Sequence, residues 1–243
     1  MVLKENLPGI MNKNIQQKRI RNFMDKKLIF NFLRDLSKNN SKEWMNEHRN
    51  KYIEAKNIWL NEIEIILNRL SLYDENLKFI RPIDTISRIN NNRRFHPDKP
   101  IYKDNFTFTP YNGMFSASFH ISLSPEYSFM GGGIYHPDNF TLNKIREAID
   151  YDGSLLMKIL NSKKFIDFHG SLDYDSDQLK SAPKGYNKDH KYIDLLKRRN
   201  FTAIIELTQK EVISEKFVGY ISEAFISIKP LIDYLNNAIA FKA

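Results

Sequence analysis

Residues 87–106, SRINNNRRFHPDKPIYKDNF, concentrate side chains that could bind an anion. The stretch carries five basic residues, one histidine and two prolines. Guanidinium groups bind phosphate or carboxylate oxygens in pairs, and a loop stiffened by proline loses less entropy when it holds them around a ligand. The candidate ligand-binding residues are Arg88, Arg94, Lys99, Tyr102 and Lys103 in this stretch, together with Arg49 from a predicted helix.

Two residues near these cations could transfer a proton. Asp98 lies within the loop and could orient a neighbouring cation or act as a general base. His120 belongs to the polar face of a predicted hairpin, opposite Asn105, and an imidazole titrates near neutral pH. Each also has a structural interpretation, since Asp98 could pair with the loop's own cations and His120 could be a hydrogen-bonded strand residue. The catalytic residues therefore stay unknown, as does whether the protein is an enzyme.

Other chemistry has weaker support. The chain has no cysteine, which excludes a thiolate nucleophile, and its histidines show neither HExxH nor a paired metal-ligand spacing, so we predict no metal site. No Gly-x-Ser-x-Gly elbow is present. The triple glycine at 131–133 matches neither GxGxxG nor a P-loop, and we expect it to form a bulge facing Phe119 or to allow close approach of another backbone. The identity of any cofactor stays unknown.

The composition is that of a globular protein. Of 243 residues, 42% are hydrophobic, including 17 Phe and 12 Tyr, which is ample for a buried core. There is no apolar run of 18 residues and no apolar signal core at the N-terminus. We therefore expect a soluble, cytoplasmic protein without a membrane partner.

The net charge of +8 favours a polyanionic partner such as nucleic acid. Half of this charge, however, lies in residues 1–23, which carry five basic residues and one acidic residue, so the rest of the chain is only mildly basic. We predict that residues 1–23 form a flexible basic arm and residues 24–243 a single α+β domain. Nucleic acid is the less favoured partner, because no RNP-like strand, zinc finger or recognition helix is present.

Apolar spacing predicts helices before the basic stretch. Leu28, Phe32, Leu33 and Leu36 indicate a helix that Asn39 and Asn40 end. We expect Asn40 and Glu43 to form a capping box for a long helix over residues 41–70. The alternation from Asp84 to Ile89 predicts a strand.

A hairpin should follow the basic stretch, because Asn112-Gly113 favours a two-residue type I′ turn. Pairing outward from this turn places Phe108 opposite Ala117 and Phe106 opposite Phe119. This pairing separates an apolar face from a polar one. The apolar face contains Phe106, Phe108, Phe115, Phe119 and Ile121, and the polar face contains Thr107, Thr109, Ser116, Ser118 and His120.

The remaining elements complete an α+β fold with a central antiparallel sheet between long N- and C-terminal helices. We predict strands over residues 127–135 and 201–207, a helix after Asp138, and shorter helices near 155–160 and 163–168. Residues 179–190 should be a polar loop. Ser214 could cap a last helix, which Pro230 should kink without changing its buried face.

Over about residues 28–238 the chain resembles the family called domain of unknown function 2461, because several of its motifs occur in the order expected for that family. The motifs are Asn40-Ser41-Lys42-Glu43-Trp44 with Arg49 and Tyr52; Arg88, Arg94-Phe95, Asp98-Lys99-Pro100 and Tyr102-Lys103; Phe129-Met130-Gly131-Gly132-Gly133; and Ala182-Pro183-Lys184-Gly185-Tyr186 with His190. Met45 stands where the family tends to have Phe, and Asn90 to Asn92 replace the more varied Tyr, Arg and Asp residues that the family has there. The resemblance brings no activity with it, because the family has no assigned reaction.

Three hypotheses follow. In the leading one, the protein binds a small anionic ligand, phosphorylated or carboxylated, where the basic loop meets the polar face of the hairpin. The second is a nucleic-acid or protein-binding module that uses the basic arm and the loop, with affinity that falls steeply with salt. In the third, the motif only stabilises the fold. The sequence does not give the oligomeric state.

Overall fold

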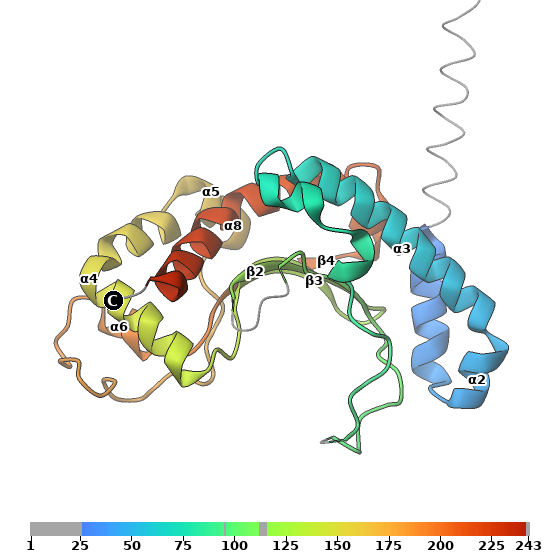
Figure 1. Cartoon of the computed structure of the whole chain (residues 1–243), viewed down its shortest axis with the longest axis horizontal. Coiled ribbons are helices and arrows are strands. Elements are labelled where there is room, and N and C mark those ends of the chain that lie inside the picture. The colour runs from blue at the N-terminus through green and yellow to red at the C-terminus, as the bar shows by residue number, and fades with distance from the viewer. Residues whose placement is uncertain (1–25, 95, 112–115, 242–243) are drawn as a thin grey trace, which may run out of the picture.

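The computed structural model describes residues 26–94, 96–111 and 116–241. Within these ranges one four-stranded antiparallel sheet, ordered β1-β2-β3-β4, lies among helices that precede and follow its strands (Figure 1). The predicted α+β class is confirmed, whereas the predicted arm over residues 1–23 lies outside the described residues. In the described ranges, no helix has the length and apolar character that a membrane span needs.

Residues 26–38 are helical, in agreement with the prediction for this segment. The elements that follow are α2 (Lys42–Glu47), α3 (Arg49–Leu70), η1 (Glu75–Phe79), η2 (Pro82–Thr85), β1 (Phe106–Phe108), β2 (Ser118–Leu123), β3 (Ser128–Ile134), α4 (Asn139–Leu160), α5 (Lys163–His169), α6 (Ile193–Lys197), β4 (Phe201–Leu207), α7 (Gln209–Ile213) and α8 (Phe217–Ala240).

The long helix predicted over 41–70 is divided into α2 and α3 at His48, where φ is −106° and ψ is 19°. The His48 ring stacks on Trp44 at 4.3 Å, and its Nδ1 lies 2.9 Å from the Trp44 carbonyl oxygen. The N-cap of α2 is Ser41, whose hydroxyl accepts a hydrogen bond from the Trp44 amide. The prediction that Asn40 caps this helix is therefore wrong.

The segment predicted as a strand from Asp84 begins instead inside the short 3-10 helix η2. Pro82 occupies its first turn, where proline has the required φ and needs no N–H partner. The Thr85 hydroxyl donates to the Pro82 carbonyl at 2.7 Å. The Ser87 amide then donates to the side chain of Thr107 rather than to a strand carbonyl.

The hairpin is present, but its predicted register is wrong by four residues. Phe106 pairs with Leu123 and Phe108 with Ile121. The ladder ends at Phe108 because Pro110 has no N–H to donate. Ala117 is not available to pair with Phe108, since its N–H and carbonyl both bond to the side-chain amide of Asn236 at 2.9 Å. The predicted turn at 112–113 lies outside the described residues.

The two predicted faces of the hairpin are nevertheless confirmed, because a shift by an even number of residues leaves every side chain on its own face. On the apolar face, Phe106, Phe108, Phe119 and Ile121 are all buried. The predicted face residue Phe115 lies outside the described residues, and Ser116 is not part of a strand.

The glycines at 131–133 form no bulge. Gly131, Gly132 and Gly133 pair without a break with both β2 and β4. Of the two expectations, close approach of another backbone is the one that the structure shows, because a Cβ on Gly131 would overlap the Ala203 carbonyl oxygen of β4. On the other face, a Cβ on Gly132 would lie 2.9 Å from the Ile232 side chain of α8. The absence of side chains here lets α8 lie flat on the sheet.

The C-terminal elements match their predictions closely. Strand β4 has the predicted bounds, α4 begins after its N-cap Asp138, and α8 buries the predicted stripe around Pro230. The last helix begins at Phe217 with Lys216 as its N-cap, so the prediction that Ser214 caps it is wrong: Ser214 is the C-cap of the short α7. The predicted helices near 155–160 and 163–168 correspond to the end of α4, beyond a kink at Asp152, and to α5.

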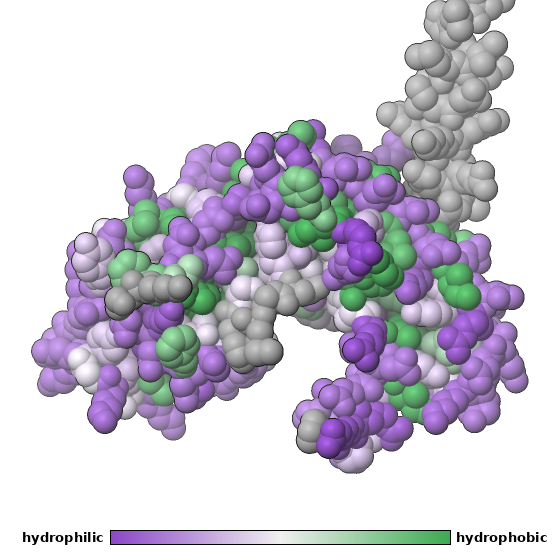
Figure 2. All heavy atoms as spheres, viewed as in Figure 1, coloured by the Kyte–Doolittle hydropathy of each residue, from purple (hydrophilic) through white to green (hydrophobic). Residues whose placement is uncertain are grey.

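The helices cover one face of the sheet and leave the other open. Figure 1 shows α3 and α8 over the face that carries the buried Phe and Ile side chains. The opposite face, called the polar face below, carries His120, Ser122, Phe129 and Thr202. Figure 2 shows the molecule hollowed below the sheet, between the basic loop and the side formed by α4. Candidate sites therefore lie on this face.

Candidate functional site

The basic stretch folds as an irregular hairpin that projects from the body of the molecule (Figure 1). Asn90 and Tyr102 form an isolated antiparallel bridge, and the Lys103 amide donates to the Ile89 carbonyl at 2.7 Å. Further out, the Arg93 guanidinium donates twice to the Pro97 carbonyl, at 3.1 and 2.7 Å. These bonds hold the loop without a regular strand, as its prolines require.

Asn40 fixes this loop to the N-terminal helices. Its side-chain oxygen accepts from the Tyr102 amide and its side-chain nitrogen donates to the Tyr102 carbonyl, both at 2.9 Å. The amide side chain thus pairs with the Tyr102 backbone as a neighbouring strand would.

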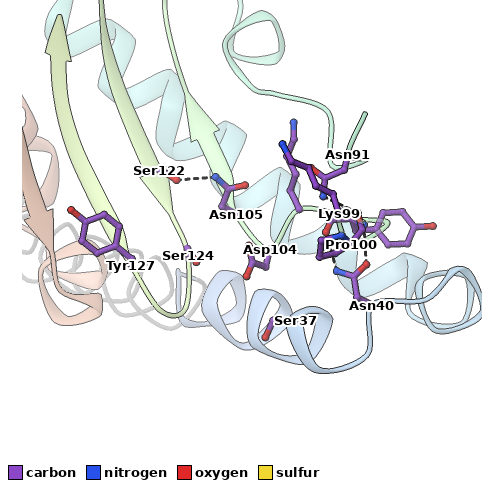
Figure 3. Close-up of a pocket in the computed structure, with 12 residues that line it drawn as sticks. Ser37, Asn40, Asn91, Lys99, Pro100, Asp104, Asn105, Ser122, Ser124 and Tyr127 are labelled. Carbon is purple, nitrogen blue, oxygen red and sulfur yellow. Dashed lines mark hydrogen bonds between the residues drawn. The ribbon is translucent and has the colours of Figure 1, made fainter. Parts of the chain in front are cut away.

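The first cavity lies between this loop and one end of the sheet, and has a volume of about 560 Å³. Figure 3 shows the loop residues on one side of it and Tyr127 on the other. Its lining includes amide, hydroxyl and ammonium groups and one carboxylate, and is formed by Ser37, Asn40, Asn91, Lys99, Pro100, Tyr102, Lys103, Asp104, Asn105, Ser122, Ser124 and Tyr127. Such a lining suits a small, strongly hydrated ligand.

A second cavity, of about 770 Å³, lies further along the polar face. Its lining combines aromatic rings with hydroxyl groups and contains no lysine or arginine among the described residues. The residues are Thr109, Tyr111, Ser116, Ser118, His120, Phe129, Gly131, Gly132, Gly133, Tyr135, Asp173, Tyr174, Ser176, Asn200, Thr202 and Ile204.

The family model described as "Conserved hypothetical protein (DUF2461)" matches residues 28–234, which include the loop and residues from both cavities. The chain belongs to the DUF2461 family. This confirms the resemblance that the motifs indicated. No curated protein and no solved structure matches the chain.

The electrostatics of this DUF2461 chain single out Lys103. Burial lowers the pKa of its ammonium, and the positive charges of Arg88 and Lys99 lower it further. Lys103 donates to the Arg88 carbonyl at 2.9 Å, which leaves two of its three N–H groups for other acceptors. Within the described ranges, Arg88, Lys99 and Lys103 form no ion pair with a carboxylate. The positive charge at the first cavity is therefore not neutralised there by an ion pair.

His120 lies at the second cavity. Its Nδ1 is 2.7 Å from the Thr109 hydroxyl, and its Nε2 has no hydrogen-bond partner among the described residues. Burial lowers the pKa of His120 below its ordinary value. The ring is therefore neutral near pH 7, and one of its nitrogens is an acceptor.

The structure brings three of the predicted residues together: Lys99, Tyr102 and Lys103 line the first cavity. Arg88 adds its charge beside them but does not line it. The predicted convergence of the loop cations with His120 around one space does not hold, because His120 lines the other cavity.

The other candidates lie outside both linings. Arg94 and Asp98 are exposed on the outer part of the loop. Arg49 is exposed on α3, where it donates to Asn46 at 3.3 Å. Across the described residues, no three His, Asp or Glu side chains gather as metal ligands.

Most of the neutral residues of the first cavity were not predicted from the sequence. Asn40, Asn105 and Ser122 come from separate segments, and Asn105 donates to Ser122 at 2.9 Å. Only the polar alternation of the hairpin indicated which way Ser122 would face, and nothing in the sequence indicated that Asn40 would reach the loop.

Proposed function

We propose that this protein binds a small anionic ligand, phosphorylated or carboxylated, in the first cavity. The observation that carries the proposal is that Lys99 and Lys103 line this cavity beside Arg88 and that, among the described residues, none of the three forms an ion pair with a carboxylate. Partial burial lowers the pKa of Lys103, and repulsion from Arg88 and Lys99 lowers it further. A bound anion would relieve this repulsion, because an opposite charge nearby favours the protonated ammonium.

The neutral lining supports the same function. Lys99 and Lys103 supply charged donors from the loop, and Ser124 and Tyr127 lie across the cavity at the end of the sheet (Figure 3). The loop is held by its own backbone bonds and by Asn40, so part of the entropy cost of ordering these cations is met before the ligand arrives.

The test is a thermal-shift screen against inorganic phosphate and a panel of phosphorylated and carboxylated metabolites. Lys99→Ala and Lys103→Ala should abolish the stabilisation that a hit produces. Lys163→Ala, on α5 and paired with Asp167, is the matched control and should keep it. The proposal is refuted if the two cavity variants respond to every anion as the unmodified protein does.

The alternative is a nucleic-acid or protein-binding module that uses the basic arm and loop. The exposure of Arg93, Arg94 and Lys99 on a projecting loop favours it. This function requires affinity that falls steeply with salt and that weakens when residues 1–23 are deleted. A small-molecule site in the first cavity requires neither.

A further inference from the structure

The two cavities share a boundary on the polar face of the sheet. Ser122 lines the first cavity, and its partner across the strands, Phe129, lines the second. The Phe129 ring lies 5.6 Å from the ring of Tyr127, which lines the first cavity, and 5.6 Å from the ring of His120, which lines the second. Tyr127, Phe129 and His120 thus form a row of rings, called the aromatic row below, that leads from one cavity into the other.

The two cavities differ in charge. The first has two cations, Lys99 and Lys103, and the carboxylate of Asp104 in its lining, whereas the second has aromatic rings, hydroxyls and the carboxylate of Asp173 without a lysine or arginine. Two tyrosines of the second cavity, Tyr135 and Tyr174, expose 70% and 92% of their surface, so their rings are available to a ligand. One end of this face therefore suits an anion, and the other suits an uncharged ring.

We propose that the two cavities form one elongated site for a nucleoside phosphate, with the phosphate at Lys99 and Lys103 and the base against the aromatic row at Phe129. This inference rests on the proposed function, because it assigns the anion to the first cavity. Ser122 and His120 are two residues apart on β2, which separates them by roughly 7 Å along the strand. A single ligand can span that distance.

The lining explains why the ring should be a planar base. Aromatic side chains bind flat rings by offset or edge-on stacking, and stacking tolerates any base. The edge of a base carries donors and acceptors, and the Nε2 of His120, which lacks a partner among the described residues, could meet one of them. The hydroxyls of Ser176 and Thr202 line the same cavity and suit the sugar.

The experiment compares four probes by calorimetric titration of the full chain: inorganic phosphate, ribose 5-phosphate, adenosine 5′-monophosphate and adenosine. The monophosphate should bind about tenfold more tightly than phosphate or ribose 5-phosphate, which is a typical gain from stacking one base. Phe129→Leu, which keeps apolar volume but removes the ring, should abolish this difference while phosphate binding is unchanged. Lys103→Ala should weaken the binding of inorganic phosphate, ribose 5-phosphate and adenosine 5′-monophosphate.

Phe129→Ala serves as a second variant, and Phe79→Ala, at a residue that is 86% exposed, is the control that should change nothing. Equal affinity for phosphate and the monophosphate, or an equal loss for both in Phe129→Leu, would overturn the inference and leave the proposed function intact. Tight binding of ribose 5-phosphate alone would also overturn it. If none of the three phosphates binds, the inference fails, and the proposed function then holds only for a carboxylated ligand.

Discussion

Asn40→Ala tests whether the side-chain amide fixes the basic loop. The substitution removes two hydrogen bonds of 2.9 Å to the backbone of Tyr102, a residue only 8% exposed and 62 positions away in the sequence. At about 0.5–1.5 kcal/mol for each bond, the free energy of unfolding should fall by about 1–3 kcal/mol. In a domain of this size each kcal/mol lowers Tm by about 2–4 °C.

Urea denaturation measures that change, and hydrogen exchange locates it. The amide of Tyr102 should exchange faster in Asn40→Ala, and phosphate should bind more weakly because the loop cations lose their anchor. Asn39→Ala is the matched control, since Asn39 is exposed and its side chain donates to the carbonyl of Asp35, in the helix that ends just before it. If the two variants have the same stability and the same Tyr102 exchange rate, Asn40 does not hold the loop.

Three further predictions concern the fold. Lys26→Met should cost about 3–5 kcal/mol in urea denaturation, because it leaves the Glu62 carboxylate buried without its cation. Burial lowers the pKa of His169 to about 4, so the unfolded chain binds this proton first and stability is lost as pH falls from about 6.5 to 4. His169→Gln should reduce that loss in thermal melts across this range. Gly131→Ala should cost about 1–3 kcal/mol or more, since its Cβ would overlap the carbonyl oxygen of Ala203 in β4.

Each of these has a control at an exposed or open position. Lys163→Met breaks the exposed pair with Asp167 and should lower the free energy of unfolding by at most about 1 kcal/mol. If Lys26→Met lowers it by no more than Lys163→Met does, the prediction for the buried pair is wrong. His96→Gln, on the exposed loop, should leave the pH profile unchanged. Gly219→Ala, with nothing within 4 Å of the added Cβ, should stabilise α8 by about 0.5–1 kcal/mol. A tolerated Gly131→Ala would mean that β3 and β4 can separate there.

Elements set by local chemistry were predictable from the sequence. The bounds of β4 and the buried stripe of α8 follow from apolar spacing over neighbouring residues. The register of the hairpin was not predictable, because Asn236, more than a hundred residues later, takes the backbone groups of Ala117. Asn40 was assigned to a helix cap for the same reason: its actual partner, Tyr102, is distant in the sequence.

The candidate site shows the same division. The sequence located Lys99, Tyr102 and Lys103 because they lie within one short stretch. It also placed His120 on the correct face of the hairpin, since face depends only on alternation along a strand. It could not show that His120 and the lysines line different cavities, because that depends on the true register and on how the loop is anchored.

The charges along the polar face also decide which way a ligand with one anionic end would lie. Lys99 and Lys103 mark the loop end, and Asp173 lies at the other cavity, where its carboxylate accepts from the Ile204 amide at 3.2 Å. A phosphate in the second cavity would face that carboxylate without a lining cation to offset it, and the lysines would remain without an anion. The repulsion by Asp173 and the loss of an anion beside the lysines both disfavour a ligand that lies with its phosphate in the second cavity. Asp173→Asn should therefore strengthen phosphate binding only if phosphate also enters the second cavity, and leave it unchanged if the first cavity is its site.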